Sequence, residues 1–339
     1  MPVCTKMPYR KKLVAKTSCA AAMFLGALSL GISPSFAQDF PEGNISVTIP
    51  TGEGGGADRD ARSFVQVWNK YLPRNVEFSY YPGAAGQVGY EFYMRGDASP
   101  SNLLFSNIGP EVIMLELQDV PVEIGEDIVY IQKTSTEPMA IWVGANSPFE
   151  TLEQLIEEAK TRPVTISVSR LPHPATIGML ALGEATGAEF NLIPFGGGNP
   201  TAMAAITGEV DASALPLANP ITFGEEARVL GIFADENPVP DQTNDAPTVN
   251  EVAGTDLPPL TSSRAWAVQA DAIAENPELI EILKQTMRQT LEDPEYIEAV
   301  RASGVPAEFI DPGNQEEAMQ EAAETRELAI QYRDLLTGE

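Results

Sequence analysis

Cysteine and histidine are almost absent from this chain of 339 residues. Both cysteines, Cys4 and Cys19, lie in the first 37 residues, which carry the features of an export signal. Without that segment the chain has no thiol, which excludes disulfides, a cysteine nucleophile and a cysteine metal site. The single histidine, His173, lies between two prolines and is interpreted as a residue of a surface loop. The sequence therefore predicts no metal centre, no bound cofactor and no catalytic group.

Positive charge is scarce as well. The chain has 48 acidic residues against 21 lysines and arginines, for a net charge of -27. Removal of the first 37 residues takes away five basic residues and no acidic one, so the net charge becomes about -32. Such a surface repels nucleic-acid phosphates and anionic lipid headgroups. We expect neither nucleic acid nor a membrane surface among its partners.

The chain also lacks an apolar run of the roughly 20 residues that a membrane-spanning helix needs. Its N-terminus instead has five basic residues, an apolar stretch around Ala20 to Leu30, and the small-x-small sequence Ser35-Phe36-Ala37 before Gln38. This pattern predicts a secretory signal peptide over residues 1–37 and a location in the periplasm; the alternative is an N-terminal membrane anchor. We expect the mature protein to begin at Gln38 and to be a soluble monomer.

Short apolar strands alternate with helices in the first part of the mature chain. Hydrophobic periodicity predicts strands at 45–49, 76–80 and 103–106, and helices at 57–72 and 87–95. This βαβαβ pattern implies a parallel sheet with right-handed crossovers.

The rest of the chain repeats the plan and then becomes helical. Further predicted strands are 128–132, 139–143, 164–168, 190–195 and 265–268, and further predicted helices are 151–159, 175–185, 277–291, 294–303 and 315–336. Proline-rich loops fill 237–259. Because the C-terminal helices have no strands of their own, they pack most economically on the first domain. We expect an α/β fold with a discontinuous lobe 1 (38–138 plus 262–339) and a lobe 2 (139–261).

Two glycine-rich turns follow short strands of the first lobe. The first occupies residues 50–58 and the second residues 82–89. Glycine turns that lead into helices leave backbone N–H groups uncovered, and a helix N-terminus adds partial positive charge. Ligands of such sheets bind outside the carboxyl ends of the strands, and two lobes can close around a solute there. The pattern indicates capture of a small anion.

A dinucleotide-binding enzyme is the main alternative. The sequence Gly52-x-Gly54-x-x-Ala57 matches the dinucleotide fingerprint, and Glu77 follows at the distance of a ribose-binding acid. The chain would then be an exported NAD(P)-dependent oxidoreductase. Against this, the charges of Glu53 and Asp58 oppose a pyrophosphate, and the second glycine turn has no use in such a site. The chain also lacks a phosphate-binding Gly-Lys-Ser/Thr loop and a G-x-S-x-G nucleophile elbow.

The motifs taken together resemble those of the periplasmic receptors of tripartite tricarboxylate transporters, often called the Bug family. Two glycine motifs carry the resemblance: Pro50, Gly54, Gly55, Asp58 and Arg62 in the first, and Pro82, Gly83, Ala84, Gly86 and Gly89 in the second. Further matches are Thr186-Gly187, Ile193-Pro194-Phe195-x-Gly197, Gly208-x-Val210-Asp211, Trp266 and Asp293-Pro294. The resemblance covers nearly the whole mature chain.

The resemblance implies a two-lobed periplasmic binding protein of the type 2-like, Venus flytrap kind, with a mostly parallel sheet flanked by helices in each lobe. It implies a receptor that captures a small organic acid and delivers it to membrane permease subunits; a receptor that reports to a membrane sensor is the alternative. In the family, the two glycine loops hold one carboxylate and the second lobe selects the rest of the solute. The ligand-binding residues implied by position are Thr51, Gly52, Glu53, Gly54, Asp58, Gly83, Ala84, Ala85, Ser106, Asn107, Ser169, Thr176 and Asn199.

Two departures from the family pattern bear on the ligand. Glu53 stands where small residues are usual, and Tyr80-Tyr81 replace the common Asn-Arg. A carboxylate in an anion-binding loop repels an anionic solute unless it turns outward. These changes leave aromatic or amphipathic acids, or a less anionic solute, open beside a simple di- or tricarboxylate.

Overall fold

The long strand β4 (Ile128–Gly144) belongs to both halves of the sheet. In the computed structural model, which describes Met1, residues 40–118 and residues 120–338, the first half of β4 pairs with β9 (Thr261–Gln269). Its last residues pair with β7 (Ala212–Pro216). The strand order is β2 (Val76–Tyr80), β1 (Ile45–Ile49), β3 (Asn102–Asn107), β9, β4, β7, β5 (Val164–Val168) and β6 (Phe190–Pro194). Strands β8 (Ala227–Phe233) and β10 (Ile310–Gly313) also pair with β4. One strand therefore connects the two halves of the sheet, each with its own helices.

The first lobe contains the strands at the β2 end of the sheet. Its elements are β1 (Ile45–Ile49), α1 (Gly56–Trp68), β2 (Val76–Tyr80), the 3-10 turn η2 (Gly83–Gly86), α2 (Gln87–Met94), β3 (Asn102–Asn107) and α3 (Ile108–Leu117). Strand β1 is parallel to β2 and β3, and β9 is antiparallel to β3. The predicted βαβαβ order is confirmed, and both glycine turns follow the carboxyl ends of their strands.

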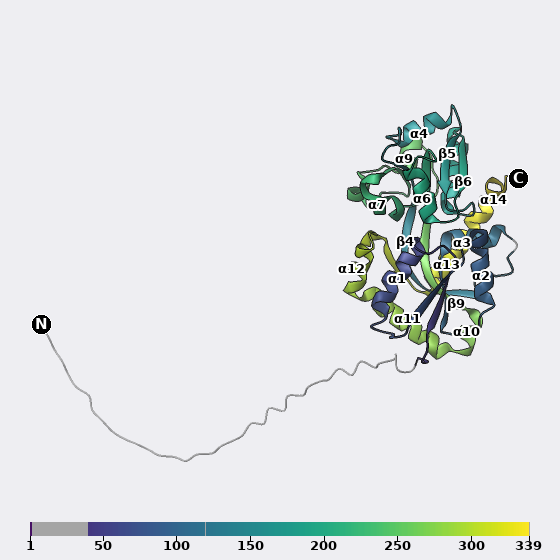
Figure 1. Ribbon diagram of the computed structural model, residues 1–339, viewed down its shortest axis with the longest axis vertical. Coiled ribbons are helices and arrows are strands. Elements are labelled where there is room, and N and C mark those ends of the chain that lie inside the picture. The colour runs from purple at the N-terminus through teal and green to yellow at the C-terminus, as the bar shows by residue number, and fades with distance from the viewer. Residues whose placement is uncertain (2–39, 119, 339) are drawn as a thin grey trace, which may run out of the picture. The chain divides into compact units, whose positions relative to one another are not determined.

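The second lobe surrounds the β6 end, where β5 (Val164–Val168) is parallel to β6 and β7. Its other elements are α4 (Leu152–Ala159), α5 (Pro174–Thr186), β6 (Phe190–Pro194), α6 (Gly198–Ile206), α7 (Ala218–Phe223), η3 (Gly224–Glu226), β8 (Ala227–Phe233), α8 (Pro240–Thr243) and α9 (Val249–Ala253). Local signals place these helices: the Thr151 hydroxyl accepts from the Gln154 N–H, and Gly187 ends α5 with a φ of 72°. In Figure 1, α4, α6, α7 and α9 lie in the same half of the folded region as β5 and β6.

The C-terminal region is mostly helical. It comprises α10 (Ala270–Glu275), α11 (Pro277–Glu292), α12 (Pro294–Ala302), η4 (Ala307–Phe309), β10 (Ile310–Gly313), α13 (Gln315–Gln331) and α14 (Arg333–Thr337). Helices α11 and α12 pack against α1 of the first lobe, whereas the short α14 packs against α5 of the second. Tyr332 and Leu336 join the apolar core of the second lobe there. The end of the chain thus adds a connection between the lobes.

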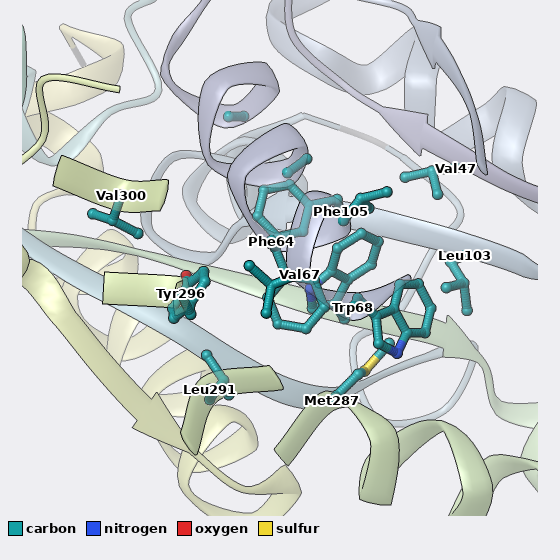
Figure 2. Packing of buried hydrophobic residues seen from close by; sticks show 14 of the residues in the cluster. Val47, Phe64, Val67, Trp68, Leu103, Phe105, Met287, Leu291, Tyr296 and Val300 are labelled. Carbon is teal, nitrogen blue, oxygen red and sulfur yellow. The ribbon is translucent and has the colours of Figure 1, made fainter. Parts of the chain in front are cut away.

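An aromatic cluster fixes the first lobe. The Trp266 ring of β9 lies 5.1 Å from Phe64, 5.5 Å from Trp68 and 4.7 Å from Phe105, measured between ring centroids. Figure 2 shows Phe64 and Trp68 of α1 facing side chains of α11 and α12, among them Met287 and Tyr296. Buried aromatic rings contribute large apolar area and prefer tilted or offset contacts such as these. The cluster holds α1, β3 and β9 together, and thereby the loops that follow β1 and β3.

The structure differs from the predicted elements where polar residues continue a strand. The predicted strands 128–132 and 139–143 are one strand, because the polar residues between them find partners from β9 and β10: Lys133 Nζ lies 2.8 Å from Asp311 Oδ2, and Glu137 pairs with Arg264. The predicted loop 237–259 contains the short helices α8 and α9, the second with a capping box at Thr248. The predicted helix 315–336 is divided at Tyr332.

The described residues from Phe40 onward belong to one compact unit. The boundaries of lobes 1 and 2 drawn from the sequence stay a prediction. The predicted signal peptide and its cleavage site before Gln38 lie outside the described residues, Met1 apart.

Candidate functional site: a cleft between the lobes

Four helices begin at one cavity between the two lobes. This cavity of about 230 Å³, called here the glycine-loop cavity, is lined by capping or first-turn residues of α1 and α3 from the first lobe and of α5 and α6 from the second. These residues are Gly55, Gly56, Asn107, Pro110, His173, Gly197 and Gly198. The first N–H groups of a helix have no partner within the helix and carry partial positive charge. The cavity is therefore suited to an anion.

A second cavity, of about 380 Å³, lies beside the first and is called here the alanine-turn cavity. Pro82, Ala84 and Ala85 of the second glycine turn line it. It shares Thr51, Ser169, Arg170, Gly196 and Gly197 with the glycine-loop cavity. The two cavities are thus neighbouring parts of one cleft, with walls from both lobes.

The two glycine turns of the first lobe touch each other. A Cβ added to Gly89 would lie 2.9 Å from Cα of Pro50, and one added to Gly86 would lie 3.2 Å from the Pro50 carbonyl oxygen. Only glycine permits this approach. Ala84 and Ala85 have φ values of 49° and 58°, a left-handed conformation that costs an L-residue about 1–2 kcal/mol. Strain of this kind tends to persist at functional sites.

Eight of the thirteen predicted site residues line the cleft: Thr51, Gly52, Glu53, Ala84, Ala85, Asn107, Ser169 and Asn199. Thr51 Oγ1 is buried and has no hydrogen-bond partner among the described residues. Asn199 Nδ2 donates to the carbonyl oxygen of Gly54 at 2.9 Å, so the second lobe touches the first glycine loop. That these residues bind the ligand stays a prediction.

The other five predicted residues, Gly54, Asp58, Gly83, Ser106 and Thr176, do not line either cavity. Asp58 is buried and holds the first glycine loop in shape. Its carboxylate accepts from the Gly54 N–H at 2.8 Å, from Arg62 Nε at 2.6 Å and from the Tyr80 hydroxyl at 2.6 Å. Burial and the bond to Asp58 raise the pKa of Tyr80 to about 12, so the tyrosine remains a neutral donor. Tyr80 therefore supports the loop from behind.

Ser106 and Thr176 also act one step behind the cleft. The Ser106 hydroxyl donates to Glu111 Oε2 at 2.9 Å, and the same carboxylate accepts from the backbone N–H of Asn107. Thr176 Oγ1 donates to the carbonyl oxygen of Arg170 at 3.2 Å. The Thr176 hydroxyl thus contacts a residue that lines the cleft, whereas the Ser106 hydroxyl contacts Glu111, which lines neither cavity.

Glu53 turns toward the surface. Its side chain is 72% exposed, and its Oε1 lies 3.7 Å from Nη2 of Arg62. The carboxylate thus has a cationic partner outside the cavity. The presence of Glu53 in the first glycine loop is compatible with an anion in the cleft.

Six polar residues of the cleft were not predicted from the sequence as site residues: Gln118, Arg170, His173, Asn219, Ser262 and Arg264. Arg170 directly follows Ser169 at the end of a predicted strand, a position that could have drawn notice. Arg264 had no comparable local signal. It reaches the first turn of α1 only because β9 lies between β3 and β4.

The Arg264 guanidinium is buried beside the start of α1. Its Nη1 lies 3.0 Å from Asp60 Oδ2 and 2.5 Å from Glu137 Oε1. Burial alone would lower the pKa of Arg264, but the two carboxylates raise it above its usual value, so the group stays charged. A Cβ on Gly56 would lie 2.9 Å from Arg264 Nη2, which explains why a residue without a side chain begins the helix.

His173 is buried, so the interpretation of a surface loop residue was wrong. Its Nδ1 accepts from the backbone N–H of Ala175 at 3.1 Å and thereby caps α5. Burial, and next the charge of Arg170, lower the pKa of His173 to about 3. The ring is neutral at physiological pH and adds no charge to the cleft.

Within residues 40–118 and 120–338, no three His, Cys, Asp or Glu side chains gather closely enough to hold a metal ion. Over the part of the chain that the structure describes, no helix has the length and apolar character needed to cross a membrane.

Two α/β lobes with a cleft at their strand ends are the fold of the periplasmic binding proteins, which solved structures of that kind share with this chain. The chain belongs to the tripartite tricarboxylate transporter family receptors, whose family model matches residues 103–335. The predicted family and fold class are thereby confirmed. A receptor family is not an enzyme family, so the oxidoreductase alternative is set aside.

Individual relatives are distant in sequence and similar in fold. Protein BugT of Bordetella pertussis is 25% identical over 278 residues, which cover 80% of this chain and 83% of BugT. A TctC solute-binding protein from Polaromonas has a TM-score of 0.62 at 21% identity and covers 88% of this chain and 100% of its own. An R. palustris protein solved with adipate has a TM-score of 0.77 at 16% identity, with coverages of 88% and 99%.

Proposed function

We propose that this receptor captures a small organic acid and holds one of its carboxylates in the glycine-loop cavity. The observation that carries the proposal is the convergence of four helix N-termini on that cavity. The chain as a whole is strongly acidic, with a net charge of -27. The helix starts at the cavity therefore supply partial positive charge within a chain that is strongly acidic overall.

In this proposal the first lobe binds the carboxylate with backbone N–H groups of the first glycine loop and with the Thr51 hydroxyl. Thr51 Oγ1 is buried without a partner among the described residues, and such a group costs free energy until it finds one. A carboxylate oxygen supplies the acceptor. The similar R. palustris structure was solved with adipate, which supports a carboxylate as the ligand class.

The test is a comparison of wild type, Thr51→Val and Thr51→Ser by thermal shift and calorimetric titration with adipate, malate and the neutral adipamide. We expect the acids, and not adipamide, to raise the melting temperature, because binding to the native state stabilises it. Thr51→Val should weaken acid binding about tenfold, the effect of one hydrogen bond to a charged group, while Thr51→Ser stays close to wild type. The ligand-free Thr51→Val protein should be no less stable than wild type.

If none of the acids binds, or if adipamide binds as well as adipate, the proposed carboxylate site is wrong. If Thr51→Val binds acids as tightly as wild type, the Thr51 hydroxyl does not contact the carboxylate.

We further propose that residues 1–37 are removed on export, that the mature receptor is a periplasmic monomer, and that it delivers its solute to membrane permease subunits. The family gives the transport role, and the N-terminal sequence pattern supports the export route. N-terminal sequencing of protein from a periplasmic extract should begin at Gln38, and a retained Met1 would contradict the signal. Solute uptake by membranes that hold the permease subunits separates transport from a sensor role.

The predicted lobe boundaries imply closure about β4 and β9. These strands are paired where they cross between the lobes, with Pro138 opposite Thr261, and the Met139 N–H donates to the Leu260 carbonyl oxygen at 2.8 Å. We propose that the hinge lies at this pair. Small-angle scattering should give a smaller radius of gyration with saturating ligand, and an unchanged radius with confirmed binding would argue against a hinged cleft.

A further inference from the structure

Arg170 is the cation of the cleft whose charge is least neutralised. The residues that line the two cavities include two cations, Arg170 and Arg264. Arg264 is paired with two carboxylates, Asp60 and Glu137. Arg170 is paired with one, Glu111, at 3.2 Å between Nη2 and Oε1. The positive charge that remains for a ligand therefore belongs mainly to Arg170.

The carboxylate of Glu111 is already shared among several donors. Glu111 is fully buried and accepts from the Ser106 hydroxyl, from the backbone N–H of Asn107 and, at 3.1 Å, from Asn107 Nδ2. These bonds spread its negative charge, so it compensates Arg170 only in part. Arg170 Nη1 donates to the Ala85 carbonyl oxygen at 2.6 Å. A guanidinium has five N–H groups, and these two contacts leave donors for a ligand.

The position of Arg170 matters as much as its charge. It lies on the loop between β5 and α5 of the second lobe, lines both cavities, and contacts Ala85 and Glu111 of the first lobe. Its side chain is 12% exposed, so a bond to it is only weakly screened by solvent. The neighbouring His173 is neutral and does not compete for an anion. The start of α1 and Arg170 line the same cavity from different lobes.

We propose that Arg170 is the specificity-determining residue that selects acids with a second negative charge, by binding the distal carboxylate of a dianion from the second lobe. This proposal rests on the proposed function, because it assumes that the first lobe holds one carboxylate. A planar guanidinium matches a carboxylate with two parallel hydrogen bonds, whereas an uncharged amide end gains much less from it.

The experiment compares each diacid with its own monoamide: succinate with succinamate, and adipate with adipamate. Within a pair the two ligands have nearly the same size and shape and differ in the distal charge. Wild type should bind the preferred diacid at least about tenfold more tightly than its monoamide, the effect of one charge-assisted hydrogen bond.

The central variant is the double substitution Glu111→Gln with Arg170→Gln. The single change Arg170→Gln would leave Glu111 buried without its ionic partner, which destabilises the fold and repels every anion. The double variant removes one charge of each sign, so the long-range field at the first glycine loop is nearly unchanged. We expect its diacid and monoamide affinities to agree within about threefold, with the monoamide bound as in wild type.

Two more variants complete the set. Arg170→Lys keeps the charge without the planar fork and should retain part of the preference for the diacid. Arg162→Gln is the matched control, because Arg162 also belongs to the second lobe but pairs at the surface with Glu158 and Asp211. Its affinities should match those of wild type.

A wild type that binds monoamides as tightly as diacids overturns the role of Arg170 and leaves the proposed function intact. Equal losses for both ligands of a pair in the double variant also overturn it, because they indicate a structural role. If wild type binds neither the diacids nor the monoamides, the proposed function itself fails. A preference that is present in wild type, reduced in Arg170→Lys and erased in the double variant supports the proposal.

Discussion

The two walls of the cleft are built from different chemistry. The glycine loop from Gly52 to Ala57 and the alanine turn at Ala84 and Ala85 give the first lobe a wall of loop backbone, beside which Thr51, Asn107 and Arg264 contribute side chains. The wall of the second lobe adds side chains, among them Ser169 and Arg170. Backbone N–H groups at a helix start present the same donors to any carboxylate. Side chains differ in charge, length and number of donors, and so distinguish one solute from another.

The two walls also depend on different features of the sequence. The backbone wall needs residues that let two loops approach, and glycine supplies this at Gly86 and Gly89. The side-chain wall needs support for a few polar groups, and Thr176 and Glu111 supply it for Arg170. Substitutions in the first wall should therefore act through loop geometry, and those in the second through individual contacts.

At neutral pH, the largest effect on stability is expected where the two glycine turns touch. Gly89→Ala places a methyl group 2.9 Å from Pro50 Cα, and such overpacking costs about 1–3 kcal/mol. Gly52→Ala is the matched control, because a Cβ there meets nothing within 4 Å, and it should change the unfolding free energy by less than about 0.5 kcal/mol. Urea unfolding measures both. Equal effects would show that the contact between the turns does not determine the geometry of the first wall.

His173, which caps α5 in the second wall, should make the free energy of unfolding depend on pH. The folded pKa of His173 is about 3, below the unfolded value of 6.5, so between these values the unfolded chain binds more protons. The contribution of the neutral His173 ring to the free energy of unfolding is fully present above pH 6.5. It decreases as the pH falls toward 3, by up to about 1.4 kcal/mol per pH unit.

The variant for this test is His173→Asn, which retains a side-chain acceptor for the cap of α5. Since His173 is the sole histidine, the decrease between pH 6.5 and 5.5 should be largely absent in the variant. Urea unfolding at several pH values measures it. The same slope in both proteins would contradict a buried neutral histidine.

A smaller change, an increase in the free energy of unfolding, is expected for a substitution in the alanine turn. Ala85→Gly removes the strain of a φ of 58° and should raise the unfolding free energy by up to about 1 kcal/mol, after the entropy cost of glycine. Ala181→Gly in the interior of α5 is the control and should lower it by about 1 kcal/mol. Thermal unfolding compares the two, and a loss of stability in Ala85→Gly would argue against the left-handed turn.

The smallest effect is expected at Glu53. Because this side chain is 72% exposed and lies near Arg62, Glu53→Ala should change the affinity for adipate by less than about twofold. Calorimetric titration decides. A tenfold loss would mean that Glu53 contacts the solute as an acceptor, and the first wall would then not be a backbone wall alone.

The predictions from the sequence were closer for the backbone loops of the cleft than for its side chains. Strand ends and glycine turns were located well, since β1, β2 and β5 have the predicted bounds. The first glycine loop and the turn at Ala84 and Ala85 both reach the cleft. These features depend on neighbouring residues along the chain. Asp58 and Ser106 were assigned to the ligand, whereas the structure places them behind the loops, because a polar residue near a strand end can face either way.

The sequence by itself determined the lobes' α/β character, the glycine-marked loops and the acidic character of the chain, because periodicity, turn chemistry and charge are properties of local sequence and composition. Only the tertiary structure decided which side chains complete the cleft. Arg170 and Arg264 are separated by more than 90 residues in the chain, and the fold brings both to the same cavity. The burial that makes His173 neutral and the turn of Glu53 toward Arg62 likewise depend on contacts that no local pattern encodes.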